Sequence, residues 1–315
     1  MSSNDPKRAG FVAVLGAPNA GKSSLVNALV GHKVSIVTQK VQTTRFQIRG
    51  VMMAGQTQVV LVDTPGVFAP RRRLDRAMVA AAWAGAEDAD VIVHVVDAAA
   101  ASRALAGKTG GQDGRAEEDT RRVIDGLKNA ERKAVLVLNK IDLIRREELF
   151  SLAEHFNKTD VYSDIFMISA SNGSGVKDLS AHLVARMPES EWFYDSDQVA
   201  DLPMRLLAAE ITREKLFLRV HDELPYGLTV ETDSWQERKD GSVRIDQTIF
   251  VEREGHKPMI IGKGGQSLKT IGELARKELS AELEREVHLF LHVKVRPGWS
   301  EERARYSALG LEFDA

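Results

Sequence analysis

The stretch FVAVLGAPNAGKSSLVNALV, residues 11–30, constrains the fold more than any other part of the chain. It joins a continuous apolar run to a helix-like segment through a loop of the form G-x-x-x-x-G-K-S, from Gly16 to Ser23. A short continuous apolar run is typical of a strand that is buried on both faces of a mainly parallel sheet. The pattern therefore predicts a phosphate-binding turn between a buried strand and a helix.

Four more apolar runs of this kind follow, and helix-like stretches separate them. They read VVLVD, VIVHVVD, AVLVLN and IFMIS. After a flexible segment at residues 1–9, we expect an α/β domain over residues 10–187, with a six-stranded, mainly parallel sheet. Between Asp97 and Asp119 the sequence is rich in alanine and glycine, and we expect a mobile surface loop there.

The composition excludes several classes of protein. The 315 residues include no cysteine, which rules out disulfides and thiolate chemistry. No apolar run approaches the roughly 20 residues of a membrane helix, and the first ten residues lack the apolar core of a signal peptide. The eight histidines lack the spacing of a zinc site. We expect a cytoplasmic, monomeric protein; contact with the inner face of the cell membrane stays open.

A change of pattern divides the chain. Residues 188–203, PESEWFYDSDQVADLP, lose periodicity and gain acidic residues, which indicates a linker. In residues 204–315 three stretches alternate apolar and polar positions as half-buried strands do, and apolar residues recur at helical spacing from Leu268 to Leu283. A second, α+β domain is therefore expected. Residues 186–315 hold 19 Lys and Arg against 25 Asp and Glu, so a nucleic-acid site there requires a local basic patch.

The G-x-x-x-x-G-K-S loop has a direct chemical interpretation. Its glycines allow backbone N–H groups to surround a polyphosphate at a helix N-terminus, where the helix dipole also favours anions. Lys22 is expected to reach the terminal phosphates and Ser23 to offer its hydroxyl to Mg²⁺. The residues expected to surround the nucleotide phosphates are Gly16, Asn19, Ala20, Gly21, Lys22, Ser23 and Ser24.

Two later motifs fit a guanine nucleotide. In DTPG, Asp63 is expected to bind Mg²⁺ and the Gly66 amide to contact the terminal phosphate. In NKID, a carboxylate at Asp142 can accept from both N1–H and the 2-amino group of guanine, which adenine cannot match. Asn139 and Lys140 precede it, and Ser169 and Ala170 end the last strand, where a backbone N–H can approach guanine O6. The order predicts GTP or GDP as ligand.

This ordered set resembles the translation-factor-like P-loop GTPases, and VSIVTQKVQTTRFQIRG, residues 34–50, looks like the first switch of the Era family. The resemblance implies Thr44 as a Mg²⁺ ligand beside Ser23 and Asp63, with Thr43 as the alternative. Lys22, Thr44, Gly66 and Asn19 are then the residues expected to act in GTP hydrolysis.

Slow intrinsic hydrolysis is expected. Many small GTPases carry a water-orienting glutamine directly after D-x-x-G, and this chain has Val67 there. The resemblance suggests that Asn19 helps to hold a K⁺ ion that replaces an arginine finger; the alternative is that Asn19 caps a turn. Arg71, Arg72 and Arg73 follow DTPG and could act electrostatically or form a solvated or RNA-facing patch.

The stretch MIIGKGGQSLKTIG, residues 259–272, is not a second P-loop, because no serine or threonine follows its lysine. It fits the G-x-x-G loop with which KH domains clamp nucleic-acid backbone. Six Lys or Arg and two acids lie between Arg253 and Lys277. The expected RNA-binding residues are Lys257, Ile261, Gly262, Lys263, Gly264, Gly265 and Lys269.

A P-loop GTPase followed by a KH domain of type II again resembles the Era family. The resemblance implies a GTP-hydrolysing switch that binds the 3′ end of 16S ribosomal RNA and assists assembly of the 30S subunit. Two alternatives remain: a P-loop ATPase or kinase, against which Asp142 argues, and an RNA-binding module with a structural nucleotide site, against which Lys22, Ser23 and Asp63 argue.

Overall fold

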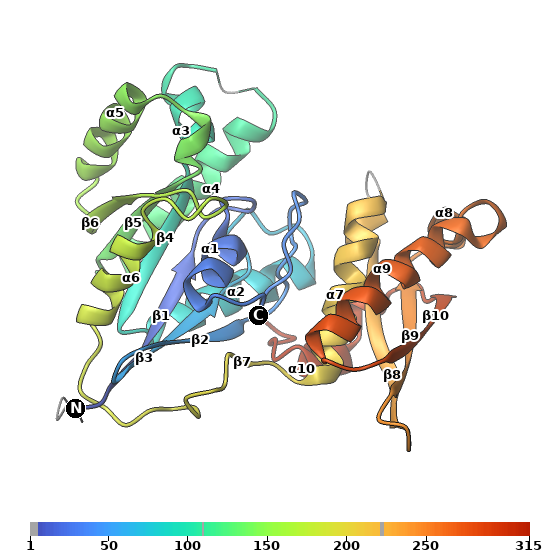
Figure 1. Ribbon diagram of the computed structural model, residues 1–315. Helices are drawn as coiled ribbons and strands as arrows, with labels where there is room; N and C mark the ends of the chain where they lie inside the picture. The colour runs from blue at the N-terminus through green and yellow to red at the C-terminus, as the bar shows by residue number, and fades with distance from the viewer. Residues whose placement is uncertain (1–5, 109, 221–223) are drawn as a thin grey trace. The chain divides into compact units, whose positions relative to one another are not determined.

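The computed structural model describes residues 6–108, 110–220 and 224–315, and these form two compact units (Figure 1). The first unit ends at Asp201 and also includes Tyr306–Ala315, whereas the second comprises Leu202–Arg305. Each unit has its own hydrophobic core. The fold class is confirmed as an α/β domain followed by an α+β domain.

The sheet of the first unit has seven strands rather than the six expected from the sequence. Its strands are β1 (Arg8–Leu15), β2 (Ile48–Ala54), β3 (Thr57–Asp63), β4 (Val91–Asp97), β5 (Ala134–Asn139), β6 (Tyr162–Met167) and β7 (Ala200–Asp201). Their order is β6-β5-β4-β1-β3-β2-β7, and β2 alone is reversed, since it runs antiparallel to both of its neighbours, β3 and β7. The additional strand has two residues, too short to show alternation in a sequence.

Helices cover both faces of this sheet. On one face α1 (Lys22–Val30) and α6 (Val176–Ala185) pack against the valines of β1, β4 and β5. On the other face lie α2 (Arg73–Glu87), α4 (Gln112–Asn129) and α5 (Arg146–Asn157). Because both faces are covered, the four central strands are almost entirely apolar. Their carboxyl ends meet at one edge, where ligands bind in open α/β sheets.

The expectation of a mobile loop between Asp97 and Asp119 was wrong. Residues Ala98–Leu105 form a helix, α3, and α4 begins at Gln112. Asp97 caps α3 by accepting from the Ala100 N–H at 3.0 Å, and Arg103 joins α3 to Asp113 of α4 by two hydrogen bonds of 2.6 and 2.9 Å. Ala98–Ala100 are buried. The alanines that suggested a loop are strong helix formers once one face is covered.

The segment from residue 188 to 203 runs along the edge of the first sheet. The Trp192 indole N–H donates to the Gln56 carbonyl at 3.0 Å, and the Phe193 N–H donates to Gln58 Oε1 at 2.8 Å. The segment then pairs with β2 through β7. Although its sequence is acidic and aperiodic, this segment therefore makes specific contacts with the first unit.

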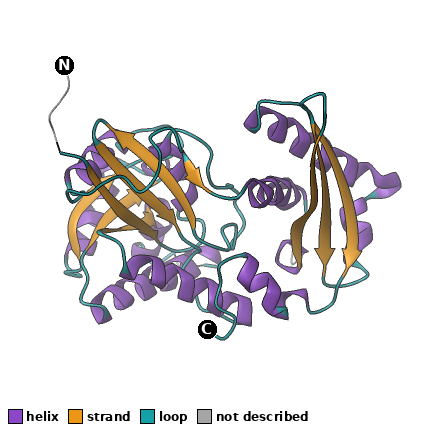
Figure 2. Ribbon diagram, turned by 90° about the horizontal axis from the view of Figure 1, so that it is seen from below, coloured by secondary structure: helices purple, strands orange, loops and turns teal. Residues whose placement is uncertain are grey.

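The second unit is a three-stranded sheet with helices packed on it. Its elements are α7 (Met204–Arg219), η2 (Leu224–Gly227), β8 (Leu228–Glu237), β9 (Val243–Val251), α8 (His256–Ile261), η3 (Lys263–Gly265), α9 (Gln266–Glu282), β10 (Val287–Val295) and η4 (Trp299–Glu301). The last helix, α10 (Arg303–Ala308), begins in the second unit and ends in the first. The three strands lie side by side (Figure 2). Their order is β10-β9-β8, and β9 is parallel to β10 and antiparallel to β8. Within the described part of the chain, we find no helix with the length and apolarity needed to cross a membrane.

Candidate functional site

The loop after β1 can form only with glycine at two of its positions. A Cβ atom on Gly16 would lie 2.3 Å from the Val95 carbonyl oxygen, and one on Gly21 would lie 2.2 Å from Asn139 Nδ2. Both residues have φ angles, 153° and 96°, that other residues rarely adopt. The loop thus turns tightly and leads directly into α1 at Lys22.

Lys22 spans this loop from the first turn of α1. Its Nζ donates to the carbonyls of Gly16 and Ala17 at 3.1 and 3.0 Å. Burial lowers the pKa of Lys22 to about 8, although the nearby Asp63 carboxylate acts in the opposite direction. Within the described residues, the hydrogen bonds of this buried ammonium group go to neutral carbonyls, so the group is well placed to bind an anion.

Three oxygen-bearing side chains converge next to Lys22. Ser23 Oγ donates to Asp63 Oδ2 at 2.7 Å and lies 2.9 Å from Thr44 Oγ1. Thr44 Oγ1 lies 3.4 Å from the same carboxylate oxygen. Burial raises the pKa of Asp63. Among the described residues, Asp63 Oδ1 has no hydrogen-bond partner although it is buried. A buried carboxylate oxygen of this kind is suited to bind a cation.

The two neighbouring threonines of this segment point to different partners. Thr43 Oγ1 donates to the Lys40 carbonyl at 2.7 Å and lies 2.6 Å from Thr38 Oγ1. Thr44 is the one beside Ser23 and Asp63. The geometry therefore favours Thr44 over Thr43 as a metal ligand.

The backbone after Asp63 passes close to the phosphate loop. A Cβ atom on Gly66 would lie 2.9 Å from Pro18 Cγ and 3.0 Å from Pro18 N, and the Val67 N–H donates to the Gly16 carbonyl at 3.1 Å. Val67 is 2% exposed and belongs to the apolar core beneath the sheet. Its side chain therefore lies in the core and cannot contact a bound nucleotide.

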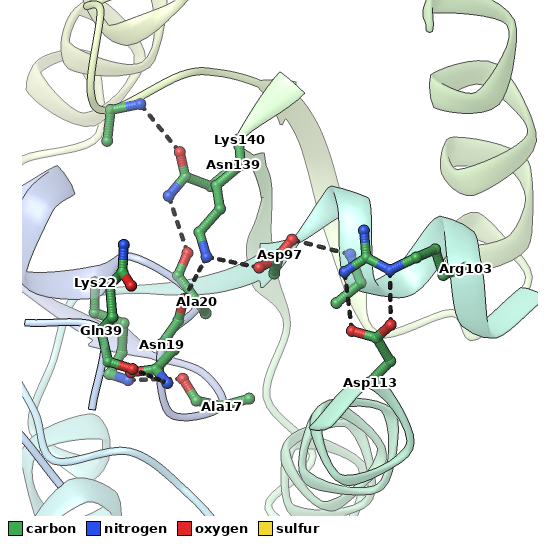
Figure 3. A network of polar contacts seen from close by, with 12 residues as sticks. Ala17, Asn19, Ala20, Lys22, Gln39, Asp97, Arg103, Asp113, Asn139 and Lys140 are labelled. Carbon is green, nitrogen blue, oxygen red and sulfur yellow. Dashed lines mark hydrogen bonds and ion pairs between the residues drawn. The ribbon is translucent and has the colours of Figure 1, made fainter. Parts of the chain in front are cut away.

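Asn139 and Lys140 connect the end of β5 to the phosphate loop (Figure 3). Asn139 Nδ2 donates to the Ala20 carbonyl at 2.9 Å. Lys140 Nζ donates to the Asn19 carbonyl at 2.7 Å and to Asp97 Oδ2 at 2.6 Å. Sequence reasoning missed Asp97. The signal was present, because Asp97 is the charged residue at the end of the strand VIVHVVD.

The remaining residues expected to bind the base lie at the same edge of the sheet. Asp142 is exposed in η1 (Ile141–Leu143), and Ser169 is fully buried after β6. The Ala170 N–H donates to Asn139 Oδ1 at 3.0 Å. If the Ala170 N–H also donates to guanine O6, this N–H must therefore be shared between guanine O6 and Asn139 Oδ1. Ser24 is half-buried in α1.

The Asn19 side chain contacts the first-switch segment, residues 34–50, at a position before Thr43 and Thr44. Its φ angle is 63°, and its Nδ2 donates to the Gln39 carbonyl at 2.9 Å. The side-chain carbonyl oxygen, which is the atom able to coordinate a cation, is not used in this contact. Gln39 is a second residue that sequence reasoning missed, since the contact uses its backbone.

The three arginines after DTPG are not equivalent. Arg71 and Arg72 are exposed, and their backbone N–H groups both donate to Asp75 Oδ2 at 3.1 Å. The Arg73 guanidinium lies 4.3 Å from the centre of the Phe313 ring. Arg71 and Arg72 thus have solvated side chains at the start of α2.

In the second unit, the GKGG loop joins α8 to α9. Gly262 has a φ of 73°, and a Cβ atom there would lie 2.7 Å from Ser267 Cβ. Gly264 and Gly265 also have positive φ angles, but no described atom lies within 4 Å of a Cβ placed on either. Their backbone is therefore open to a ligand on that side.

The side chains around this loop combine charge and apolar surface. Lys263 and Lys269 are exposed, Lys257 and Ile261 are half-buried, and Met259 is 64% exposed. Such a surface can contact phosphates through the lysines and bases through the apolar groups. The structure thus places all the residues expected to bind RNA on one helix–loop–helix segment.

Comparisons with known proteins find relatives of both domains. A family model described as a 50S ribosome-binding GTPase matches residues 11–140, and a KH domain model matches residues 223–300. GTPase Era of Caulobacter vibrioides is 63% identical over 307 residues, covering 98% of this chain and 97% of that protein. GTPase Era of Maricaulis maris is 59% identical and covers 99% of each.

Two solved structures are similar over nearly the whole chain. Era in complex with MgGDPNP and nucleotides 1506–1542 of 16S ribosomal RNA has a TM-score of 0.86, 36% identity, and coverage of 96% of this chain and 99% of that chain. An Aquifex aeolicus Era variant bound to GDP and AlF4− has a TM-score of 0.85 at the same identity and coverage. With relatives of this identity and coverage, the chain belongs to the Era family of GTPases.

Proposed function

We propose that this GTPase is a nucleotide-controlled switch that binds the 3′ end of 16S ribosomal RNA through its KH domain and assists assembly of the 30S subunit. The observation that carries the nucleotide half is the convergence of Ser23, Thr44 and Asp63 beside Lys22. The RNA half is supported by the open GKGG loop and by the related Era structure, which contains a segment of that RNA.

The oxygen cluster fits Mg²⁺. Hydroxyl and carboxylate oxygens are the ligands that this hard cation prefers, and the buried Asp63 Oδ1 lacks a partner among the described residues. Ser23, Thr44 and Asp63 would hold the ion. When bound, Mg²⁺ neutralises charge on the β- and γ-phosphate oxygens.

Lys22 and the backbone N–H groups of the loop would hold the phosphates of GTP. Binding of a phosphate replaces the carbonyl contacts of Lys22 Nζ by charge-assisted hydrogen bonds, which are stronger. Thr44 lies in the segment between α1 and β2 and already faces Ser23 and Asp63. A γ-phosphate would hold this segment in place by further contacts, and its loss on hydrolysis would release the segment. That difference between GTP and GDP is the switch.

Guanine selectivity would rest on Asp142. A carboxylate that accepts two hydrogen bonds from guanine rejects adenine, because its oxygens would lose those donors. Competition of GTP, ATP and XTP for binding tests this assignment, and Asp142→Asn should favour XTP. Equal binding of ATP and GTP by the parent would contradict it.

Hydrolysis would be slow without help. The position that carries a glutamine in many small GTPases holds Val67, and its side chain lies in the core. We propose that Asn19 Oδ1 helps to hold K⁺, which supplies positive charge to the transition state. Faster hydrolysis in K⁺ than in Na⁺ is expected, with the difference lost in Asn19→Ala. Equal rates in the two salts would remove this part of the proposal.

The RNA half has a direct test. Lys263→Asp combined with Gly264→Asp puts negative charge on the open side of the loop, so RNA binding should be abolished while GTP binding is unchanged. Fluorescence anisotropy with an oligonucleotide of the 16S 3′ end measures the first, and labelled GTP the second. The matched control is Lys239→Asp combined with Gly241→Asp, in the exposed β8–β9 turn.

A further inference from the structure

Asp97 uses its two carboxylate oxygens for two different structural elements (Figure 3). Oδ2 accepts from Lys140 Nζ at 2.6 Å, and Oδ1 accepts from the Ala100 N–H at 3.0 Å. The Asp97 side chain is 21% exposed and that of Lys140 is 31% exposed. The ion pair is therefore partly shielded from solvent, where an ion pair is stronger than at an open surface.

Lys140 is held at both ends. Its backbone has a φ of 64°, a left-handed conformation that a lysine rarely adopts. Its Nζ is shared between Asp97 and the Asn19 carbonyl of the phosphate loop, 2.7 Å away. The aliphatic part of the side chain is thus stretched between β5 and the loop, next to Asn139. Without Asp97, the carbonyl alone would hold the ammonium group, and the long side chain would have more rotamers available.

The other oxygen of Asp97 extends the same contact to α3 and beyond. Asp97 is the N-cap of α3. From α3, Ser102 Oγ donates to Glu148 Oε2 of α5 at 2.6 Å, and Arg103 pairs with Asp113 of α4. The carboxylate therefore lies between the base-binding motif and a group of three helices.

We propose that Asp97 is a positioning residue for guanine-nucleotide binding. It holds Lys140 against the phosphate loop, and it couples nucleotide occupancy to the N-terminus of α3. The inference rests on the proposed role of the NKID motif in binding the base. If nucleotide binding orders Lys140, the same contact stabilises the cap of α3, because coupling between two sites is reciprocal.

Three variants separate the two functions of the carboxylate. Asp97→Ser keeps a side chain that can cap a helix but is too short to reach Lys140. Asp97→Asn keeps the shape and the cap but removes the charge. Arg103→Ala cuts the link between α3 and α4 and keeps both hydrogen bonds of Asp97.

The measurement is the dissociation rate and affinity of fluorescently labelled GDP, with thermal unfolding of the nucleotide-free proteins as the folding control. Asp97→Ser is expected to weaken GDP binding about tenfold, equal to roughly 1.4 kcal/mol, mainly through faster dissociation. Asp97→Asn should show a smaller loss, and Arg103→Ala should bind GDP as the parent does.

A double-mutant cycle distinguishes positioning from a general structural effect. In a Lys140→Ala background, Asp97→Ser should cause no further loss of GDP affinity, because Asp97 acts through the lysine. An equal loss in both backgrounds would overturn the proposal, and so would unchanged binding by Asp97→Ser and Asp97→Asn in the parent. Should Asp97→Ser fail to fold, Asp97→Asn provides the same comparison.

The cycle also separates this inference from the one on which it rests. Unchanged GDP binding by Lys140→Ala would overturn the role of the NKID lysine and the inference together. Weaker binding by Lys140→Ala with unchanged binding by both Asp97 variants would overturn the inference alone. Hydrogen exchange adds an independent measurement: GDP should slow exchange of the Ala100 amide in the parent, but not in Lys140→Ala.

Discussion

Gly21 lies so close to Asn139 that a Cβ atom at position 21 would come within 2.2 Å of Asn139 Nδ2. The same amide nitrogen donates to the Ala20 carbonyl. The phosphate loop and the base-binding motif, 118 positions apart in the sequence, are thus packed against each other by direct contact.

Gly21→Ala should therefore weaken guanine-nucleotide binding by at least about 100-fold, since the methyl group displaces Asn139 and the φ of 96° becomes strained. Titration with fluorescently labelled GDP measures the effect. The control is Gly55→Ala, which has a φ of 61° but no described atom within 4 Å of the new Cβ. Gly55→Ala should lower the free energy of unfolding by about 1 kcal/mol and leave GDP affinity unchanged.

Thr44→Ala should lower the Mg²⁺-dependent rate of GTP hydrolysis by about 100-fold, because a ligand on the γ-phosphate side is lost. Thr43→Ala is the matched control, and its rate should stay within about threefold of the parent, since that hydroxyl binds Lys40 and Thr38. Single-turnover hydrolysis at saturating Mg²⁺ measures both. A larger loss in Thr43→Ala than in Thr44→Ala would reverse the assignment of the metal ligand.

The pKa of Lys22 predicts a pH dependence of stability in the nucleotide-free protein. The folded-state pKa is about 8, below the 10.5 of an ordinary lysine. Between these values the unfolded chain binds more protons than the folded protein, so this residue makes stability rise with pH across that range. Below about pH 8 its charge is a constant disadvantage.

Lys22→Met should therefore be more stable than the parent at pH 7 and should unfold at a higher urea concentration. We expect its free energy of unfolding to be larger by up to about 3 kcal/mol, and this difference should shrink towards pH 10. Equilibrium unfolding at several pH values measures this, and Lys128→Met, on the exposed side of α4, is the control. A parent that is more stable than Lys22→Met at pH 7 would show that the carbonyl contacts of Nζ outweigh the cost of burial.

Val67→Gln should destabilise the protein by about 1–3 kcal/mol and should not accelerate hydrolysis. The side chain at this position is buried in the core, where an amide lacks partners. Thermal unfolding and GTP turnover measure the two effects. A clear gain in turnover would mean that residue 67 turns towards the nucleotide when GTP is bound. Val67→Ala controls for the loss of packing.

The order and spacing of the motifs predicted the parts of the fold that depend on local pattern. Continuous valine-rich runs led correctly to buried parallel strands, because residues between two helical layers must be apolar at every position. Alternation in the second half predicted β8, β9 and β10 in the same way. The helix α7 was not predicted, although the acidic segment before it was interpreted as a linker.

The two errors in the first unit have different causes. The alanine-rich stretch after Asp97 has no strong periodicity, and its helix depends on the Asp97 cap and on Arg103 pairing with Asp113. The two-residue strand β7 exists only because β2 presents a free edge to it. The helix thus had a local signal in Asp97 and the alanines after it, whereas the two-residue strand had none.

By itself, the sequence determined the ligand classes: a loop that cradles phosphates, a carboxylate suited to guanine, and a glycine loop suited to RNA, because these depend on residue type and short spacing. Only the tertiary structure decided which threonine faces Asp63, that Val67 is buried, and that Asp97 holds Lys140. Those facts depend on side-chain direction and on neighbours brought together by the sheet, and no spacing along a chain encodes them.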